Sequence, residues 1–383
     1  MLKHDFRSTV RAHEDALLER LAEWVRIESP SHDANALDTV LDAIERRFTE
    51  SGWTSERVPL DGTADALLLR TRLGDGAEDR PSTLILAHCD TVWPIGTLAT
   101  MPWRRDGDVA AGPGVYDMKA GIAMTSVAVD LLRGLGAVTG DVTLLVNPDE
   151  ETGSVASRPV IEAQARRHDR VMVVEPAKGD GDLVASRKGA GDFRVRFEGR
   201  SAHSGDAYAD GVSALRELAA FVPWAEDLSR PDLGTTVAVT VAHAGTVSNV
   251  IPGEATAHVD LRVERPDEAE RVASALPAYV PRDARVRVTF DGAIKRPPMT
   301  LDDAARRWAD RIVALSDAMG IRTGVSASGG GSDANFTAAL GVPTLDGLGP
   351  VGAGAHASDE HVRIGATLDR TAVLAAALTD RGA

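Results

Sequence analysis

Cysteine and long apolar runs are scarce in this sequence. It has one cysteine, Cys89, among 383 residues. A single cysteine excludes an internal disulfide framework and any zinc site built from several cysteines. No apolar run approaches the roughly 18 residues that a membrane-spanning helix needs, and the first thirty residues hold no uninterrupted apolar stretch of the signal-peptide type. We therefore expect a soluble, cytoplasmic protein with no membrane partner.

Positive charge is also in deficit. The chain has 42 Lys and Arg against 57 Asp and Glu, which gives a formal net charge of −15. This balance argues against binding nucleic acid through a general cationic surface. The hydrophobic content of 43% is enough to bury a core. The length exceeds what one core usually organises, so we expect two domains.

Two common catalytic signatures are missing. Gly112-Pro113-Gly114 is not a dinucleotide-binding fingerprint, because Asp117 stands where a third glycine belongs. No Gly-x-Ser-x-Gly nucleophile elbow occurs either. The sequence therefore favours neither a nicotinamide-dependent enzyme nor a serine hydrolase of the elbow type.

Three short apolar runs predict strands that are buried on both faces. Apolar residues at helical spacing alternate with these runs. Strands that alternate with helices predict an α/β fold, with a mostly parallel sheet and helices on both of its faces. The strands are expected at 83–87, 142–146 and 171–174, and the helices at 17–25, 37–48, 120–135, 302–319 and 332–340.

The pattern changes between residues 187 and 296. Phe193, Val195 and Phe197 alternate with charged residues, which is typical of a strand with one solvent-facing side. Similar strands are expected at 255–262 and 286–290, and helices at 211–222 and 267–276. This segment is predicted to be a small α+β domain, inserted into a larger domain formed by residues 1–186 and 297–383.

Candidate catalytic residues follow the predicted buried strands. His88 and Asp90 come after the first strand, Glu150 and Glu151 after the second, and Glu175 after the third. In open α/β sheets, reactive groups gather at the carboxyl ends of the strands. Histidine and carboxylates together suit a metal that accepts nitrogen and oxygen ligands.

Two further segments are predicted to reach the same place. Asp117 lies in a tight loop before a helix, and His356 ends a glycine-rich loop at 349–356. Asp90 and His88 are two residues apart in an extended segment, so Asp90 can orient the imidazole of His88. Adjacent Glu150 and Glu151 cannot easily bind one ion together, so one is expected to ligate and the other to act as a base. Each residue alone has a structural explanation, and the set carries the metal hypothesis.

These segments resemble the co-catalytic zinc peptidases, a family that includes glutamate carboxypeptidase, aminoacylase, acetylornithine deacetylase and succinyl-diaminopimelate desuccinylase. The similarity runs from about Leu17 to the last helix and is closest to glutamate carboxypeptidase. Its motifs are His88-Cys89-Asp90-Thr91-Val92, Gly112–Lys119, Asp149-Glu150-Glu151-Thr152-Gly153, Glu175-Pro176, Ser248–Pro252 and Ala355-His356.

The resemblance implies a zinc exopeptidase-like catalytic domain that binds two Zn²⁺, with Co²⁺ or Mn²⁺ as substitutes. Asp117 would bridge the ions through a peptide bond to Met118 that is cis in the family. Glu150 would be the general base for a metal-bound hydroxide, and Asp90 would orient a ligand. The implied ligands are His88 and Glu175 for one ion, Glu151 and His356 for the other, and Asp117 for both.

The inserted domain, by the same resemblance, is ferredoxin-like and acts in dimerisation and as a lid. His203 would reach across a homodimer to the reacting carbonyl oxygen, and Arg262 would bind a substrate carboxylate. Arg262 also has a structural alternative, because it shares a solvent-facing strand side with His258 and Asp260. The remaining candidate substrate contacts are Asn249, Lys188 and Gly330.

The expected reaction is hydrolysis of an amide or peptide bond in a small N-acyl amino acid or peptide. We expect removal of a C-terminal acidic residue, glutamate by preference. The alternative within the family is an N-acyl-amino-acid deacylase or small dipeptidase. A non-catalytic ligand-binding homologue is the alternative outside it, and the complete set of candidate ligands argues against that alternative.

Overall fold

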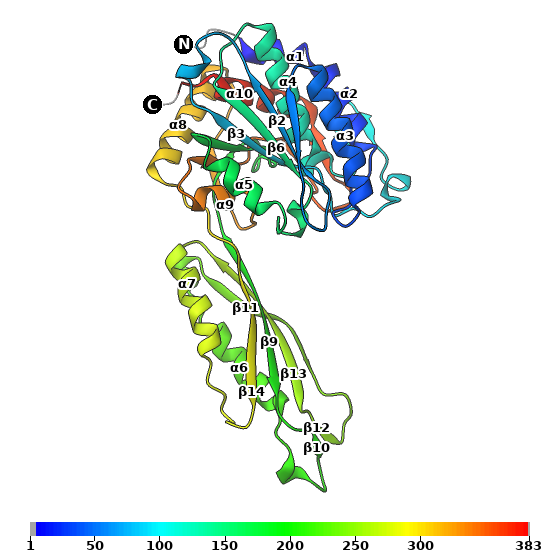
Figure 1. Ribbon diagram of the computed structural model, residues 1–383, viewed down its shortest axis with the longest axis vertical. Coiled ribbons are helices and arrows are strands. Elements are labelled where there is room, and N and C mark those ends of the chain that lie inside the picture. The colour runs from blue at the N-terminus through cyan, green and yellow to red at the C-terminus, as the bar shows by residue number, and fades with distance from the viewer. Residues whose placement is uncertain (1–4, 382–383) are drawn as a thin grey trace. The chain divides into compact units, whose positions relative to one another are not determined.

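The computed structural model describes residues 5–381, which form two compact units (Figure 1). The first unit comprises the described residues through Ser186, Leu301–Ser328 and the described residues from Ser332 onward. The second comprises Arg187–Thr300 and Gly329–Gly331. The sequence-based boundary at 296 differs by four residues from Thr300, and the glycine turn joins the second unit. Residues 1–4 and 382–383 of the predicted catalytic domain lie outside the described residues.

A six-stranded sheet forms the centre of the first unit. Its strand order is β1-β2-β6-β3-β7-β16, in which β6, β3, β7 and β16 run parallel and β2 and β1 are antiparallel additions. All six residues of β3 are buried, so both faces of the sheet are covered. The predicted α/β fold is confirmed, with three further strands, β1, β2 and β16, that were not predicted. The strands are β1 (Thr54–Val58), β2 (Ala66–Arg72), β3 (Thr83–His88), β6 (Asp141–Asn147), β7 (Arg170–Val173) and β16 (Thr344–Leu345).

The helices of the first unit pack around this sheet. Among the described residues, none of the helices combines the length and apolar character needed to cross a membrane. Their bounds agree with the predicted helices to within a few residues, while α1, α5 and α10 were not predicted individually. The helices are α1 (Phe6–Arg11), α2 (Glu14–Val25), α3 (Ala34–Glu50), α4 (Ala120–Gly134), α5 (Arg158–Ala165), α8 (Asp303–Ala318), α9 (Ala334–Ala339) and α10 (Ile364–Thr379).

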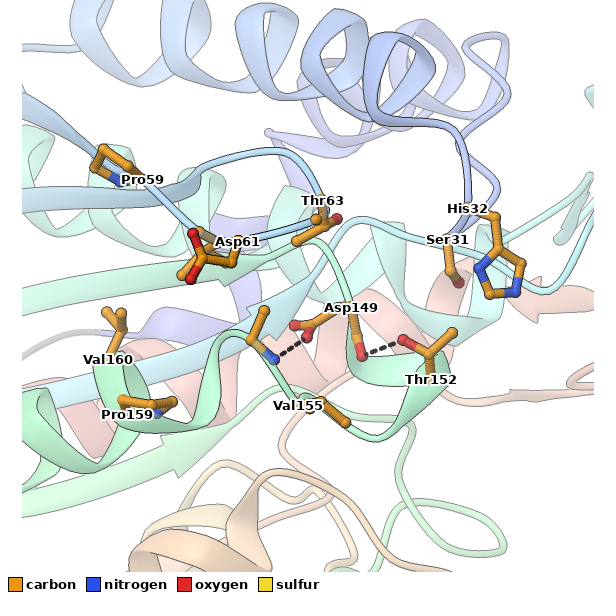
Figure 2. Close-up of a pocket in the computed structure, with 13 residues that line it drawn as sticks. Ser31, His32, Pro59, Asp61, Thr63, Asp149, Thr152, Val155, Pro159 and Val160 are labelled. Atoms are coloured by element: carbon orange, nitrogen blue, oxygen red, sulfur yellow. Dashed lines mark hydrogen bonds between the residues drawn. The ribbon is translucent and has the colours of Figure 1, made fainter.

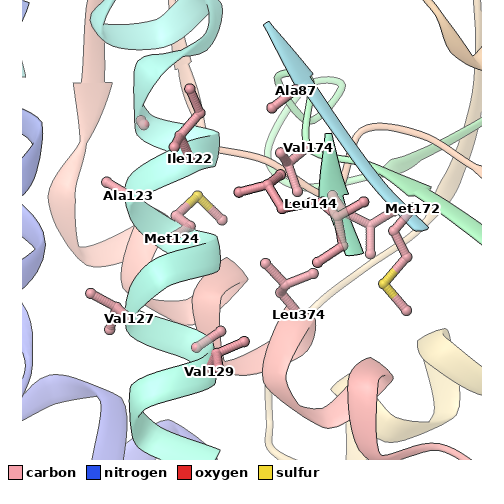
Figure 3. Close-up of a cluster of buried hydrophobic side chains, with 14 of the residues drawn as sticks. Ala87, Ile122, Ala123, Met124, Val127, Val129, Leu144, Met172, Val174 and Leu374 are labelled. Atoms are coloured by element: carbon pink, nitrogen blue, oxygen red, sulfur yellow. The ribbon is translucent and has the colours of Figure 1, made fainter. Parts of the chain in front are cut away.

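Helix α4 lies at the centre of this packing. Twelve of its residues are buried, and Figure 3 shows Ile122 and Met124 facing Leu144, Val174 and Leu374 from the sheet and α10. Gly121 allows a very close approach to the sheet, because a Cβ there would lie 2.2 Å from the carbonyl oxygen of Val174. The start of α4 is therefore fixed against the residue that precedes Glu175.

Two smaller sheets complete the first unit. One has the order β17-β18-β5-β4, and the other pairs β8 with β15. The first brings residues after His356 beside the loop that precedes Asp117, since β18 pairs with β5. Their bounds are β4 (Arg104–Asp106), β5 (Val109–Ala111), β8 (Leu183–Arg187), β15 (Val325–Ser328), β17 (Gly352–Ala353) and β18 (His361–Arg363).

The second unit has a four-stranded antiparallel sheet of order β11-β13-β9-β14. The chain runs β9 (Gly189–Glu198), α6 (Ala214–Glu226), β11 (Thr236–Ala244), β13 (Glu254–Val263), α7 (Pro266–Ala275) and β14 (Arg287–Arg296), which is the ferredoxin-like βαββαβ order. A two-stranded ribbon, β10 (Ala202–His203) with β12 (Val250–Ile251), extends it.

Three details of this unit differ from the sequence prediction. Strand β11 was not predicted. Helix α6 begins at Ala214, where the Ser213 side chain accepts from the Arg216 N–H, and it continues through Pro223. Val286 is buried but lies outside β14. The predicted alternation is correct for Phe193, which is buried with the other apolar residues of β9 while its charged neighbours are exposed.

Candidate active site

Three parallel strands bring the predicted ligands to one edge of the sheet. β6, β3 and β7 are neighbours in the order β6-β3-β7. His88 is the last residue of β3, Glu150 opens a 3-10 turn shortly after β6, and Glu175 follows β7. Carboxyl ends of parallel strands meet at one edge, so the fold itself brings these side chains together.

Asp117 reaches this edge from the segment between β5 and α4. The backbone departs from helical angles at Asp117 and Met118, and the peptide bond between them is cis, as the resemblance implies. His356 comes from the loop between β17 and β18 and has a left-handed backbone, with φ of 63°. A left-handed conformation is uncommon for a residue other than glycine and turns the loop sharply at this point.

The two carboxylate oxygens of Asp117 face two different histidines. Its Oδ1 lies 3.2 Å from His88 Nε2, and its Oδ2 lies 3.4 Å from His356 Nε2. Glu175 Oε1 is 3.6 Å from His88 Nε2, and Glu151 Oε1 is 3.2 Å from His356 Nε2. We call these groups the His88 half-site (His88, Asp117, Glu175) and the His356 half-site (His356, Asp117, Glu151).

The ligand atoms are close enough to hold metal ions. Atoms of His88, Asp117 and Glu151 lie within 4.8 Å of one another, as do atoms of His88, Glu150 and Glu175. Glu150 thus lies among the ligand candidates rather than apart from them. The contact of Glu151 with His356 distinguishes the two adjacent glutamates, because it joins Glu151 to the second half-site.

The electrostatics of the site favour positive charge. Burial opposes protonation of His88, but its hydrogen bonds to Asp117 and Asp90 and the charge on Glu175 raise its pKa well above the usual value. The hydrogen bond to Asp117 raises the pKa of His356 to about 9.

Burial and the charge on Asp117 raise the pKa of Glu175 well above its usual range, and burial also raises the pKa of Glu151. Carboxylates crowded together in this way disfavour their own ionisation unless a cation is nearby. In the metal-free protein, the raised pKa values of His88 and His356 favour the protonated imidazoles, which carry such a charge. The mixed nitrogen and oxygen donors fit divalent metal ions, which would supply it instead.

Asp90 contacts both His88 and the turn that carries Glu150 and Glu151. His88 Nδ1 lies 3.0 Å from the main-chain oxygen of Asp90 and 3.3 Å from its Oδ1. The same buried carboxylate accepts hydrogen bonds from the N–H groups of Glu150 and Glu151, at 3.2 and 3.1 Å. The hydroxyl of Ser31 also donates to it, at 2.7 Å. Asp90 therefore fixes the imidazole of His88 and the turn that carries both glutamates.

Cys89, between His88 and Asp90, is buried in the hydrophobic core of the first unit. Burial raises the pKa of its thiol, so it is not a reactive group. Sequence reasoning missed two residues near the site, Ser31 and Glu360. Glu360 is 1% exposed and accepts hydrogen bonds around Asp117. Nothing in its local sequence separates it from a surface acid such as Asp359.

The predicted substrate-binding residues lie in the second unit. His203 Nδ1 accepts hydrogen bonds from the N–H groups of Gly205 and Asp206, at 3.2 and 3.0 Å. Neutral His203 therefore carries its proton on Nε2, which is the donor-bearing nitrogen. Asn249 is exposed, and its main-chain oxygen accepts from Ser204 N–H.

Arg262, Lys188 and Gly330 already have partners within this unit. The guanidinium of Arg262 donates to both carboxylate oxygens of Asp260, each at 2.9 Å. Lys188 Nζ donates to the main-chain oxygen of Gly234 at 3.0 Å. The main-chain oxygen of Gly330 accepts from Arg187 at 3.1 Å. Each of these three predicted substrate contacts therefore has a hydrogen-bond partner within the second unit.

A pocket of about 570 Å³ lies beside the turn that carries Glu150 and Glu151 (Figure 2). Asp149 and Thr152 flank this turn and line the pocket, and Asp149 accepts from the Ala156 N–H at 2.8 Å. Ser31, which donates to Asp90, also lines the pocket. None of the predicted metal ligands lines it, so this pocket is a neighbour of the metal site rather than part of it.

Comparison with known proteins agrees with this geometry. Residues 84–380 match the model of a family described as peptidase family M20/M25/M40. The chain is 31% identical to carboxypeptidase G2 of Pseudomonas sp. (strain RS-16) over 96% of this chain and 90% of that protein. It is 30% identical to succinyl-diaminopimelate desuccinylase of Delftia acidovorans over 86% of this chain and 88% of that protein.

A solved structure supports the fold independently. The chain superposes on the aminopeptidase PepT of Bacillus cereus with a TM-score of 0.80 and 19% identity, covering 96% of this chain and 98% of that one. The family match covers most of the chain and includes five predicted ligands and Glu150. The chain therefore belongs to peptidase family M20/M25/M40 and is a metal-dependent hydrolase of that family.

Proposed function

We propose that the protein is a dinuclear zinc hydrolase that removes a C-terminal acidic amino acid, glutamate by preference, from an N-acyl or peptide substrate. The observation that carries this proposal is the position of Asp117, whose two oxygens face His88 and His356 separately. One carboxylate shared by two nitrogen-containing half-sites is the arrangement that a bridging ligand requires.

The five ligands would hold the metal ions in the two half-sites. His88 and Glu175 complete the first, His356 and Glu151 complete the second, and Asp117 belongs to both. Zinc suits this mixture of imidazole and carboxylate, and Co²⁺ or Mn²⁺ are chemically reasonable substitutes. When bound, a pair of such ions polarises the scissile carbonyl and lowers the pKa of a water molecule.

Glu150 would carry the proton transfers. It would accept a proton from the attacking water and deliver it to the leaving nitrogen, so that the products are a carboxylate and a free amine. Asp90 supports this role, because it holds the N–H of Glu150 and thereby the start of the turn. General acid–base catalysis of this kind contributes roughly 10²–10⁴-fold to the rate.

Residues of the second unit would recognise the C-terminal acidic residue of the substrate. Arg262 presents a planar guanidinium that suits a carboxylate, and a substrate carboxylate would replace or share its present partner, Asp260. His203, with a proton on Nε2, would donate to the carbonyl oxygen, and Asn249 would add a contact. A homodimer formed through this unit would supply His203 to the neighbouring chain, and size-exclusion chromatography with light scattering tests that dimer.

Replacement of the general base is the main test. Glu150→Gln keeps the size of the side chain but removes its basicity, so zinc content should be unchanged while turnover falls by roughly 10²–10⁴-fold. Glu50→Gln, at an exposed acid on α3, is the matched control and should keep full activity. Near wild-type turnover in Glu150→Gln would show that the proposed base is wrong.

A substrate panel tests the specificity. The relative named succinyl-diaminopimelate desuccinylase favours a second candidate, deacylation of an N-succinyl amino acid. We expect kcat/KM for N-benzoyl-glutamate to exceed that for N-benzoyl-leucine and N-succinyl-leucine. Equal rates on the two benzoyl substrates would exclude the acidic preference, and a preference for the succinyl compound would select the deacylase.

A further inference from the structure

Glu360 lies beside the metal site without contributing to either half-site. Its side chain is 1% exposed and follows His356 by four residues. Oε2 accepts from the indole N–H of Trp93 and the main-chain N–H of Gly114, each at 2.9 Å. Oε1 accepts from the main-chain N–H groups of Tyr116 and Asp117, at 2.9 and 3.1 Å.

The chemistry of these contacts requires a carboxylate. An ionised carboxylate has about four acceptor positions, and here four N–H donors occupy them, two at each oxygen. If either oxygen were protonated, or were replaced by the NH₂ group of a glutamine, its hydrogen would point at an N–H donor rather than at an acceptor. Burial raises the pKa of Glu360, and the N–H groups of Asp117, Gly114 and Tyr116 oppose that rise.

The four donors belong to segments that carry ligands. Trp93 lies five residues after His88, Gly114 lies three residues before Asp117, and Tyr116 precedes Asp117 directly. Glu360 itself belongs to the loop that carries His356. One buried carboxylate therefore ties together the segments that supply His88, Asp117 and His356.

The backbone of the loop before Asp117 is tightly constrained. Gly114 has a left-handed backbone with φ of 70°, and a Cβ there would lie 2.6 Å from Thr91 Cγ2. The side chain of Asp117 must then point with one oxygen toward each histidine. The contacts of Glu360 with the N–H groups of Gly114, Tyr116 and Asp117 fix the direction in which the carboxylate of Asp117 projects.

We propose that Glu360 is a positioning residue that holds the Asp117 loop against the His356 loop and so sets the separation of the two metal half-sites. This inference rests on the proposed dinuclear function. Glu360 does not act as a ligand or as a base, because the four N–H groups occupy its oxygens. Its role is to keep both oxygens of Asp117 available to two ions at once.

Metal binding alone tests the proposal, with Co²⁺ as the probe because its visible spectrum reports coordination geometry. In Glu360→Gln we expect a folded protein that binds two Co²⁺ roughly 10- to 100-fold more weakly, with an altered spectrum. Glu360→Asp restores the charge but shortens the side chain, and its affinity should be intermediate. Asp359→Asn removes a neighbouring exposed acid and should bind Co²⁺ like the wild type.

Several outcomes would overturn the proposal. They are wild-type affinity and spectrum in folded Glu360→Gln, or an equal loss in Asp359→Asn. If Glu360→Gln does not fold, Co²⁺ binding is measured in Trp93→Phe instead. This variant removes one of the four donors to Glu360. A weakening of about fivefold supports the proposal, and unchanged binding contradicts it. These measurements need no substrate, so failure of the proposed hydrolase activity would be seen separately, in the Glu150→Gln assay.

Discussion

The His88 side of the predicted metal site and the predicted substrate-binding residues differ in how firmly the fold holds them. His88 is 1% exposed, and Asp90, which orients it, is fully buried. In the second unit, the side chains of His203 and Arg262 are 47% and 40% exposed. The His88 side is thus held by buried hydrogen bonds, whereas His356, whose side chain is 51% exposed, and the predicted recognition residues are accessible to solvent.

The partners of these groups differ in the same way. Asp90 and Glu360 are bonded to main-chain N–H groups of the segments that carry ligands, so they fix backbone as well as side chains. Arg262 is paired with a side chain two residues away on its own strand. The contrast indicates that the surroundings of His88 are preorganised, whereas Arg262 can exchange its partner readily, because exchange of a solvent-exposed ion pair costs little.

The largest effect should come from Asp117. In Asp117→Asn, the shared side chain loses its charge and one acceptor oxygen, so we expect zinc content to fall from two ions per chain to one or none. Activity should drop by roughly a thousandfold, equivalent to about 4 kcal/mol. Metal analysis and steady-state kinetics measure this, with exposed Asp75→Asn as control. Two tightly bound ions in the variant would contradict a bridging role.

Asp90 should have the next largest effect. Asp90→Asn removes the charge behind His88 and places an NH₂ group among the N–H donors of Glu150 and Glu151. We expect metal affinity to fall roughly 10- to 100-fold, measured by competition with a chelator. Ser31→Ala removes a single contact to the same carboxylate and should have a smaller effect. An equal loss of metal affinity in Ser31→Ala and Asp90→Asn would contradict the central role given to the Asp90 carboxylate.

Arg262 should affect specificity and leave the metals in place. Arg262→Gln should lower kcat/KM for an acidic substrate roughly 10- to 100-fold, as expected for a lost charge-assisted hydrogen bond, with little change for a neutral one. Arg265→Gln is a matched control, because Arg265 forms the same kind of fork with Asp267 two residues away. Equal losses on acidic and neutral substrates would show that Arg262 is structural.

The smallest effect concerns the pH dependence of the metal-free protein. The pKa of His356 is raised from 6.5 to about 9, so its contacts with Asp117 and Glu151 contribute fully to stability below about pH 6.5. That contribution is lost as the pH rises through about 9. The difference in Tm between chelator-treated wild type and His356→Gln should therefore shrink over this range. It should stay small, because His356 is half-exposed.

The effect of pH on metal binding by His356 has the opposite sign, because protons and metal ions compete for its imidazole. Metal ions bind the neutral imidazole, so affinity should increase with pH until about 9. If the Tm difference grows with pH in the metal-free protein, the assignment of the raised pKa to His356 is wrong.

Half of the strands of the central sheet and most of the helices around it could be predicted from the sequence, because apolar runs and helical spacing report burial directly. The predicted strand at 83–87 is β3, and the helix at 120–135 is α4. β1 was missed because it is an edge strand whose first three residues are exposed. β11 has a mostly exposed pattern as well, which weakens the apolar alternation. The helix expected at 211–222 extends to Glu226 as α6 and accommodates Pro223.

The clustering of the predicted metal ligands could be predicted in outline because these residues stand at strand ends and in motifs. The sequence could not show that Glu360 lies behind Asp117, since the two are joined by main-chain hydrogen bonds across 243 positions. Such bonds leave no trace in local composition, because any buried acid can accept from a main-chain N–H. The pairing of Arg262 with Asp260 was visible in principle, as residues two apart on a strand share one side.

The most direct test of the account is a crystal structure of the zinc-loaded protein with anomalous diffraction measured at the zinc edge. The account predicts two anomalous peaks per chain, one between Asp117 and His88 and the other between Asp117 and His356, with Asp117 touching both ions. A zinc-saturated crystal with a single peak, or with two peaks that Asp117 does not join, would contradict it.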